Sequence, residues 1–164
     1  MSNLRVIKLA YDDEDEINQV YNIIKLCGQE MYVKDGLEHW KKPYPIEAIR
    51  KNIKNSEVYL VLSDENAVGT VTITDNKSIY FDDNIPAIYI SKFAIHPEYS
   101  GHGIGSEMMK WLEKLAVKRN IKNIRLDVYV KSEKAIAFYQ HRGFEIMDEK
   151  PTRNFSVYCM EKTL

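Results

Sequence analysis

The stretch HPEYSGHGIGSEMMKWLEKLA, from His96 to Ala116, places three glycines at alternate positions, Gly101, Gly103 and Gly105. The whole chain of 164 residues contains only seven glycines. A glycine loses more backbone entropy on folding than any other residue, and a turn needs only one or two of them. The cluster therefore indicates a loop in which something lies close against the backbone.

The segments on either side of the glycines define the setting of this loop. Ala87–Ile95 is apolar and β-branched, which predicts a mostly buried central strand. The order strand, glycine-rich turn, helix aims several backbone N–H groups at one spot and suits a phosphate or pyrophosphate. A tight turn that merely packs the helix on the strand is the structural alternative. The following residues form the apolar face of an amphipathic helix at Met108, Met109, Leu112, Leu115 and Ala116.

Two other phosphate-binding loops fit this stretch less well. A Rossmann dinucleotide site has some support, because Asp127 lies about 20 residues downstream, where a ribose-binding acid is expected. However, the Rossmann fingerprint GxGxxG needs a glycine at position 106, where this chain has Ser106. The strand should also run directly into the glycines, but His96–Ser100, which includes a proline, lies between them. A P-loop is excluded because no Lys-Ser/Thr pair follows the glycines. A nucleotide-binding oxidoreductase stays open as a third functional class.

The first part of the chain is predicted to contain a strand followed by two helices with a loop between them. Leu4–Ala10 alternates weakly and predicts an edge strand. From Asp12 to Met31 apolar residues recur at helical spacing, behind acids that suit a helix N-terminus. Gly36–Pro45 contains two prolines and predicts an irregular aromatic loop. A short helix is expected near Ile46–Lys54.

The remaining segments complete an α+β pattern. Glu57–Ser63 and Ala67–Thr74 predict a hairpin, and Ile124–Val130 predicts another strand. Ser132 is expected to cap a helix that ends at Gly143. FEIMD and NFSVYCMEK predict two final strands. Since no linker or repeat divides the sequence, we expect one domain over residues 1–164, with helices on the faces of a twisted sheet.

Composition narrows the functional classes. A formal net charge of -1 and a pI of about 6.4 give no bulk attraction to nucleic acid. The two cysteines, Cys27 and Cys159, form no disulfide framework, and no Cys/His cluster suggests a metal. Neither a signal peptide nor a membrane span is recognisable. The expectation is a cytoplasmic protein with no membrane or nucleic-acid partner and no metal.

Two motifs resemble those of a known family. FAIHPEYSGHGIGSEMMKWLEKLA (Phe93–Ala116) is similar to the acyl-CoA-binding core of the GNAT acetyltransferase superfamily, and SEKAIAFYQHRGFE (Ser132–Glu145) to its second motif. The resemblance implies a GNAT-like mixed, mostly antiparallel sheet flanked by helices. It also implies an N-acetyltransferase, in which a primary amine directly attacks the thioester of acetyl-CoA. The alternative is a non-catalytic acyl-CoA-binding module of the same fold. The acceptor would be a small-molecule or peptide amine, and a homodimer is possible.

The resemblance also implies roles for individual residues. Tyr139 matches the position that donates a hydrogen bond to the leaving sulfur. The acceptor amine would contact the aromatic loop at Glu38, His39, Trp40 and Tyr44. Acetyl-CoA would be held by Phe93, Ala94, Ile95, Ser100, Gly101, His102, Gly103, Ile104, Gly105, Ser106 and Ser132.

Three serines depart from the family pattern. Ser100 stands where relatives have Arg or Gln, so the loop keeps its backbone donors but loses a side chain that contacts phosphate. Ser132 stands where the second motif has Asn. Ser91 stands where many relatives carry a glutamate that acts as general base. The general base is therefore unassigned.

Overall fold

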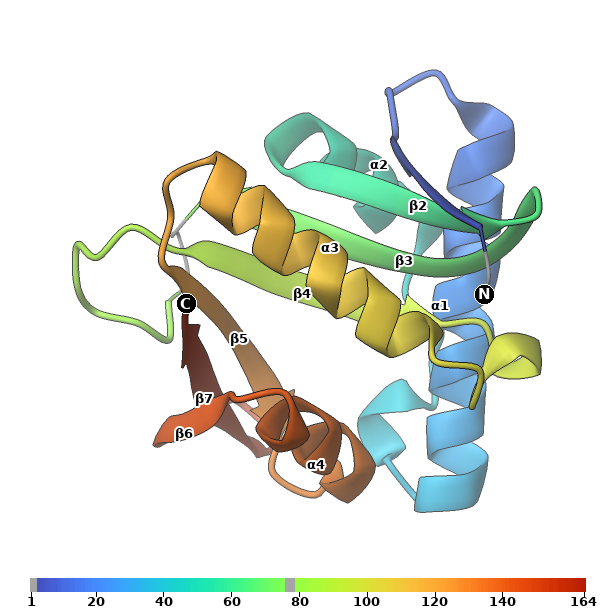
Figure 1. Cartoon of the computed structure of the whole chain (residues 1–164). Coiled ribbons are helices and arrows are strands. Elements are labelled where there is room, and N and C mark those ends of the chain that lie inside the picture. Colours follow the sequence, from blue (N-terminus) through green and yellow to red (C-terminus); the bar gives the residue numbers. More distant parts are fainter. Residues whose placement is uncertain (1–2, 76–78) are drawn as a thin grey trace. The chain divides into compact units, whose positions relative to one another are not determined.

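The computed structural model of the chain describes residues 3–75 and 79–164 (Figure 1). Within these residues seven strands form one mostly antiparallel sheet in the order β1-β2-β3-β4-β5-β7-β6, together with four α-helices. The α+β class and the mixed, mostly antiparallel sheet predicted from the sequence are confirmed.

The chain divides into two compact units, and the divisions fall inside three elements. The first unit comprises Met1–Ile73 and Lys92–Trp111, and the second Thr74–Ser91 and Leu112–Leu164. The divisions lie in strand β3 (Asn66–Asp75), strand β4 (Ile88–Ile95) and helix α3 (Ile104–Lys118). Each unit contains its own set of buried side chains. The single domain over residues 1–164 stays a prediction.

Three strands line up in the first unit. β1 (Leu4–Lys8) is the edge strand and pairs antiparallel with β2 (Glu57–Ser63), which pairs antiparallel with β3 (Asn66–Asp75). Asp64 and Glu65 form the turn of the β2–β3 hairpin with φ of 49° and 67°. Positive φ at both turn residues matches the twist of the flanking strands. The predicted edge strand and hairpin are both present.

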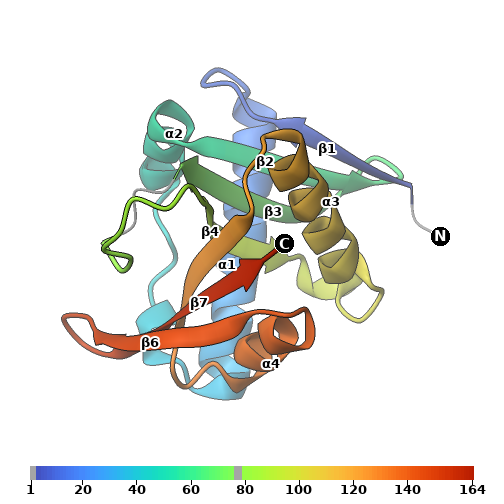
Figure 2. The ribbon, with the colours of Figure 1, turned by 60° about the vertical axis from the view of Figure 1, so that its left-hand side comes forward.

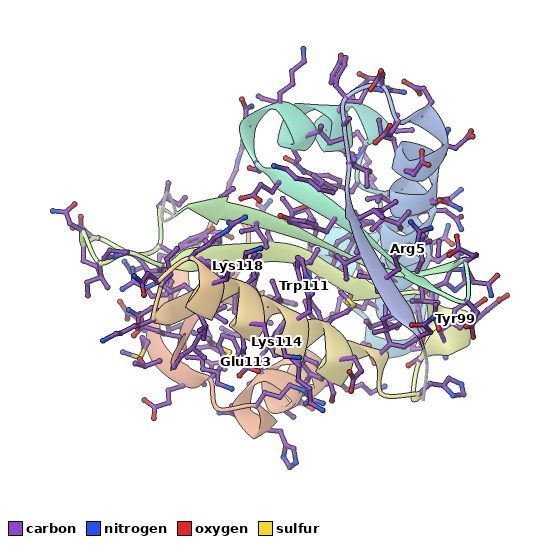
Figure 3. The ribbon with its side chains drawn as sticks, turned by 45° about the horizontal axis from the view of Figure 1, so that its top comes forward. Arg5, Tyr99, Trp111, Glu113, Lys114 and Lys118 are labelled. Atoms are coloured by element: carbon purple, nitrogen blue, oxygen red, sulfur yellow. The ribbon has the colours of Figure 1, made fainter. Side chains whose placement is uncertain are left out.

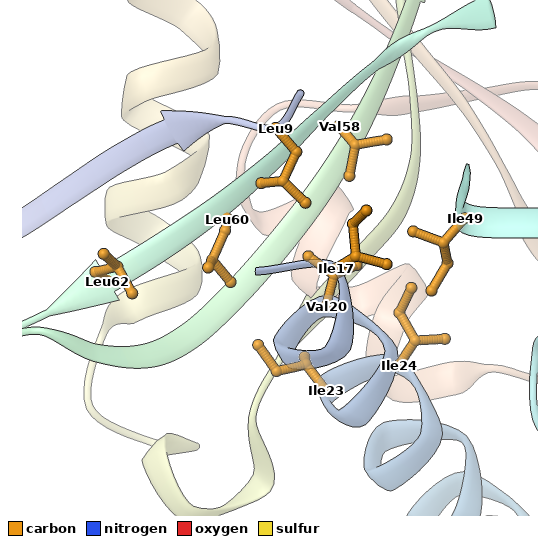
Figure 4. Close-up of a cluster of buried hydrophobic side chains, with 9 residues drawn as sticks. All are labelled: Leu9, Ile17, Val20, Ile23, Ile24, Ile49, Val58, Leu60 and Leu62. Atoms are coloured by element: carbon orange, nitrogen blue, oxygen red, sulfur yellow. The ribbon is translucent and has the colours of Figure 1, made fainter. Parts of the chain in front are cut away.

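Two helices cover one face of these strands. α1 (Glu14–Asp35) and α2 (Ile46–Asn55) follow the predicted helical segments closely. Between them, the predicted irregular loop contains a short 3₁₀ helix, Glu38–Trp40, so that segment is more regular than expected. Figure 4 shows the core that helices and strands share, formed by Leu9, Ile17, Val20, Ile23, Ile24, Ile49, Val58, Leu60 and Leu62.

The first turns of α3 lie on the opposite face of the same strands. The Trp111 ring packs edge-on against the ring of Tyr59 on β2, with centroids 4.8 Å apart. Figure 3 labels Trp111 on α3. Gly69 on β3 lets α3 approach the sheet closely, because a Cβ on Gly69 would lie only 2.7 Å from the Met108 sulfur of α3. The start of α3 is therefore seated firmly on β2 and β3, and with it the glycine loop that precedes the helix.

The second unit is built on β5 (Asn123–Tyr129). It pairs in parallel with the start of β4 for two residue pairs and antiparallel with β7 (Ser156–Thr163). β7 in turn pairs with the outermost strand, β6 (Glu145–Pro151), and Figure 2 shows these strands beside α4 (Glu133–His141). Gly143, with a φ of 91°, follows α4 in the left-handed conformation that was predicted for it.

Within the second unit, a buried arginine on β5 binds the segment that precedes β4. The Arg125 side chain on β5 is only 2% exposed. Its guanidinium binds both carboxylate oxygens of Asp83 at 2.9 Å and Glu161 Oε2 at 2.6 Å, and lies 4.4 Å from the Phe81 ring centroid. Arg125 lowers the pKa of the Asp83 carboxyl by donating these hydrogen bonds. Burial of the arginine is thus compensated by two carboxylates and one aromatic face.

Candidate active site

The glycine loop has the backbone conformation that only glycine adopts easily. Gly101 and Gly103 have φ of 82° and 80°. A Cβ at either position would meet no described atom within 4 Å, so neither glycine is needed for tight packing against the protein. Both residues are exposed, as is His102 between them. These observations count against the purely structural alternative and leave open space above the loop.

The start of α3 adds backbone donors to this loop. The first hydrogen bond of the helix runs from the Glu107 amide to the Gly103 carbonyl, at 3.1 Å. The amides of Ile104 and Gly105 precede it and have no acceptor inside the helix. Exposed Ser100 and half-buried Ser106 flank the same turn. The predicted phosphate-binding residues Ser100–Ser106 therefore lie in one loop and helix start of the first unit.

The second half of β4 presents one edge to β3 and the other away from it. The His96 amide donates to the Val68 carbonyl at 2.8 Å, and the Ala94 carbonyl also faces β3. Backbone groups alternate between the two edges of a strand. The N–H and C=O groups of Phe93 and Ile95 therefore point to the edge opposite β3.

Two side chains modify this edge. Cys27 of α1 donates its thiol to the Ile95 carbonyl, at 2.7 Å between sulfur and oxygen, and burial raises the pKa of that thiol to about 12. The thiol therefore stays protonated and acts as a donor. Lys92 has a φ of 51° in the middle of β4, a conformation that is costly for a residue with a side chain. Its ammonium lies 4.6 Å from the Tyr44 ring centroid.

The predicted acceptor residues all lie in the segment between α1 and α2. The Trp40 ring packs against α1 so closely that a Cβ on Gly28 would lie 2.5 Å from its Cε3 atom. The Tyr44 hydroxyl accepts a hydrogen bond from the Asn52 amide at 3.0 Å. Glu38 and His39 are exposed, and partial burial of the His39 ring lowers the pKa of the imidazole. The structure thus joins Trp40 and Tyr44 to the core of the first unit and leaves Glu38 and His39 on its surface.

Tyr139 lies on α4 and Ser132 directly precedes that helix, both in the second unit. Tyr139 is buried edge-on against Phe138 and Phe144, with ring centroids 5.4 and 5.6 Å away. Burial and then the negative charge of Asp127 raise the pKa of the Tyr139 hydroxyl, which keeps it protonated at neutral pH. Ser132 occupies the N-cap position, and its carbonyl accepts from the Ile136 amide. Its hydroxyl makes no capping bond, so the capping role predicted for that side chain is wrong.

The sequence does not predict the roles of several residues near these groups. The backbone conformation of Lys92 has no sequence signal, and Cys27 looked like one more apolar residue of its helix. The sequence suggests a role for Asp127 only as a ribose-binding acid. It is half-buried on β5, where the Tyr89 hydroxyl donates to its carboxylate. The sequence does contain a signal, because Asp127 is an acidic residue between the apolar Leu126 and Val128 of β5.

Over residues 3–75 and 79–164, no three His, Cys, Asp or Glu side chains gather in a way that could hold a metal ion. In the same residues, none of the helices combines the length and the apolar character that crossing a membrane requires.

Known proteins share both the sequence pattern and the fold. The model of the acetyltransferase (GNAT) family matches residues 17–144. The chain is 25% identical over 148 residues to the uncharacterized N-acetyltransferase YesJ of Bacillus subtilis, covering 84% of this chain and 79% of that protein. It is 30% identical over 83 residues to the peptidyl-lysine N-acetyltransferase YiaC of Escherichia coli, covering 51% and 53%.

A solved structure supports the same assignment at the level of the fold. The PaiA N-acetyltransferase from Thermoplasma acidophilum, in complex with coenzyme A, superimposes with a TM-score of 0.72 at 18% identity and covers 99% of each chain. The family model alone spans more than half of the present chain. This protein therefore belongs to the GNAT acetyltransferase family.

Proposed function

We propose that this protein is an acetyl-CoA-dependent N-acetyltransferase that acts on a primary amine by direct attack on the thioester. The observation that carries the proposal is the glycine loop, with two left-handed glycines, open space above them and a helix start behind. Backbone N–H groups in this arrangement suit a pyrophosphate. The coenzyme A found with the Thermoplasma protein supports the same donor.

The residues present fit such a donor substrate. Gly101–Ser106 would hold the pyrophosphate, while Phe93 and Ile95 would pair with the pantetheine arm, as a peptide adds to a strand edge. Ala94 lies between them with its carbonyl toward β3. The Ile95 carbonyl already accepts from Cys27, but a carbonyl oxygen has a second lone pair. Ser100 and Ser132 would contribute hydroxyl contacts, and the proposal includes no metal.

The proton steps are assigned to the second unit. Tyr139 would donate a hydrogen bond to the leaving sulfur, and its raised pKa means that it arrives protonated. Tyrosine titrates near 10 and a thiol near 8.5, so full transfer of the proton is uphill by about 2 kcal/mol before any perturbation. The hydroxyl therefore works best as a donor to developing negative charge.

The acceptor is proposed to be a small-molecule or peptide amine. The peptidyl-lysine activity in the name of the YiaC relative supports an amine that is cationic in solution. Glu38, His39, Trp40 and Tyr44 are proposed as acceptor contacts, since His39 and Trp40 adjoin and Tyr44 lies under the Lys92 ammonium. A homodimer through the last strands stays part of the proposal, because outermost β6 exposes Ile146 and Met147. A cytoplasmic location likewise stays a proposal.

The test is release of free CoA thiol from acetyl-CoA in the presence of a panel of primary amines. An acetyltransferase releases thiol only when an amine is present and forms an equal amount of amide. A non-catalytic acyl-CoA-binding module would bind acetyl-CoA in calorimetry without releasing thiol. A nucleotide-binding oxidoreductase would instead bind NADH in a fluorescence titration. Mass spectrometry of a cell extract incubated with acetyl-CoA would identify the acceptor.

A further inference from the structure

We propose that the ammonium group of Lys92, held over the ring of Tyr44, binds a carboxylate of the acceptor, so that the favoured acceptor is an amine that also carries a carboxylate. This inference rests on the proposed acetyl transfer and names the chemical class of its acceptor. Both residues lie in the first unit of the chain.

Lys92 has a backbone conformation that its own Cβ disfavours. Its φ of 51° lies in the left-handed region, where Cβ comes too close to a carbonyl oxygen. Asp64, Glu65 and Asn120 also have positive φ, but they lie in turns, whereas Lys92 lies inside strand β4. Glycine would adopt this conformation freely. A lysine that bears the cost inside a strand points to a role for its side chain.

Tyr44 supplies a fixed support for the Lys92 ammonium. The ammonium lies 4.6 Å from the centroid of the Tyr44 ring, and a cation is attracted to the face of such a ring. The ring packs against the hydrophobic core of Figure 4, and its hydroxyl accepts a hydrogen bond from the Asn52 amide at 3.0 Å. Because the ring is held at both places, the ammonium is positioned before a ligand arrives, which lowers the entropic cost of binding.

The positive charge of Lys92 has no negative partner within the protein. Lys92 is half-buried, yet none of the carboxylate side chains that the structure describes forms an ion pair with it. Arg50, a half-buried cation of the same unit, pairs with both Glu14 and Glu47. An ammonium has three N–H donors, and a cation partly removed from water is stabilised by an opposite charge nearby. A carboxylate on the acceptor would supply that charge.

The position of Lys92 connects the two proposed sites of the first unit. Its Cα lies about 3.8 Å from that of Phe93, the next residue, whose backbone is proposed to pair with the pantetheine arm. Its ammonium lies on Tyr44, which belongs to the segment proposed to contact the acceptor. A carboxylate bound to Lys92 would therefore anchor the acceptor beside the proposed donor edge.

Two sources of the carboxylate are distinguished by two pairs of test acceptors. A free amino acid is represented by β-alanine, with β-alaninamide as its uncharged counterpart. An acidic peptide is represented by glycylglutamic acid, with glycylglutamine as its counterpart, each with an amidated C-terminus. The members of a pair have nearly the same size, and only one of them carries a carboxylate. The quantity measured is the ratio of kcat/KM for the acid to kcat/KM for the amide.

The test compares Lys92→Gln with a charge-matched control, Lys51→Gln. Lys51 is exposed on α2, and the change removes the same charge from the same unit. Both variants are first checked for an unchanged melting temperature and acetyl-CoA affinity. Comparing the acid-to-amide ratio between variants removes the intrinsic reactivity of each amine, because that reactivity is the same for every protein.

The expected result is a selective loss of preference for the acid. The wild type should favour the acid in at least one pair, and that pair identifies the source of the carboxylate. Lys92→Gln should lower the ratio by about tenfold or more, which is the worth of one hydrogen bond between charged groups. The loss should appear mainly in KM, because the carboxylate is bound equally before and during the reaction. Lys51→Gln should stay within about twofold of the wild type. Ratios that are the same in the wild type and Lys92→Gln for both pairs would contradict the proposal.

Two further variants separate the side chain from the backbone strain. Lys92→Gly removes the side chain and relieves the cost of the positive φ, so its melting temperature should be no lower than that of Lys92→Gln. It should lose the preference for the acid to the same extent, which keeps the test open if Lys92→Gln does not fold. Lys92→Arg keeps the charge and should retain most of the preference. A Lys92→Gly variant that still prefers the acid would refute the carboxylate site.

A binding measurement separates this proposal from the proposed function. If the wild type acetylates no member of either pair, acetyl transfer to these amines is refuted. N-acetyl-β-alanine is then titrated by calorimetry into the protein in the presence of coenzyme A. Binding to the wild type and Lys51→Gln, but not to Lys92→Gln, supports the carboxylate site. Equal heats in all three proteins, or none in any, overturn it.

Discussion

At the scale of single residues, Gly103 links backbone conformation to ligand binding. Its φ of 80° is disfavoured for any residue with a Cβ, and the space beside it is open. Gly103→Val should therefore distort the loop and place a branched side chain where the phosphate is proposed to lie. We expect the affinity for coenzyme A, measured by calorimetry, to fall at least tenfold, since about 1.4 kcal/mol corresponds to that factor.

Gly36 provides a matched control for this change. It ends α1 with a φ of 67° and also has no neighbour near its Cβ position. Gly36→Val should lose a similar amount of stability, of order 1–2 kcal/mol, because the backbone strain is the same. It should bind coenzyme A as the wild type does. If both variants lose affinity equally, the effect is strain rather than a phosphate site.

Tyr139 carries the second prediction at this scale. Tyr139→Phe keeps the ring between Phe138 and Phe144 and removes only the hydroxyl. Because a positioned acid contributes roughly 10²–10⁴-fold, kcat should fall between ten and several thousand times while acetyl-CoA affinity stays nearly intact. A thioester with a better leaving group should partly restore the rate. A Phe variant with wild-type kcat, measured where chemistry limits the rate, would remove Tyr139 from the mechanism.

At the scale of elements, the contact between α1 and the 3₁₀ helix tests how the aromatic segment is held. A Cβ on Gly28 would overlap the Trp40 ring, at 2.5 Å from Cε3. Gly28→Ala should therefore push Trp40 away and lower the melting temperature, although alanine alone would stabilise a helix by about 1 kcal/mol. In a Trp40→Ala background the clash is gone, so the same change should stabilise the protein. A destabilising effect in both backgrounds would refute this contact.

Trp40→Ala by itself tests the acceptor assignment. If Trp40 contacts the amine, the variant should have a raised amine KM, with acetyl-CoA affinity within a few-fold of the wild type, as measured by steady-state kinetics and calorimetry. The packing on Gly28 adds a structural cost, because burying a large aromatic ring contributes roughly 3–5 kcal/mol in a core and less at its edge. Loss of donor binding in a folded variant would instead make Trp40 part of the donor site.

Helices and strands with a strong periodicity of hydrophobic residues were predictable from the sequence. The hydrophobic spacing identified α1, α3 and the β2–β3 hairpin, because packing against one core imposes that spacing locally. The 3₁₀ helix Glu38–Trp40 was missed, since the prolines nearby favour an irregular loop. The predicted buried strand holds only for the first half of β4, and residues from Ser91 onward are half-buried. That difference depends on which strands lie beside β4, and no local pattern records it.

The candidate site likewise has some features that the sequence predicts and others that it does not. The glycine-rich turn and the helix start after it were predictable, because the glycine cluster and the helical spacing that follows it are local features of the sequence. The Cys27–Ile95 and Tyr89–Asp127 hydrogen bonds join residues 68 and 38 positions apart. Such pairs depend on sheet register and helix placement, which a single sequence does not contain.

At the scale of the whole molecule, the Arg125 network predicts how stability depends on pH. The pKa of Asp83 is lowered in the folded state, so its contribution is complete above the unfolded pKa of about 3.9 and is lost as the pH falls through the lower, folded value. Wild type and Asp83→Asn should therefore differ most in free energy of unfolding near neutral pH and converge in acid. Glu65→Gln, which breaks the exposed pair with Arg5, should show little difference at any pH. A constant difference for Asp83→Asn in urea titrations across this range would contradict the network's role.

Apart from Ser132, the proposed donor contacts lie in the first unit, and the proposed proton-transfer group, Tyr139, lies in the second. Acetyl transfer by the whole chain is therefore the central claim, and one measurement tests it most directly. The full chain is mixed with acetyl-CoA and a panel of primary amines, and free thiol and amide are quantified together. We predict amine-dependent thiol release, with one amide formed for each thiol and a large loss of both in Tyr139→Phe. A protein that binds acetyl-CoA but releases no thiol with any amine, or with a cell extract, would contradict the account.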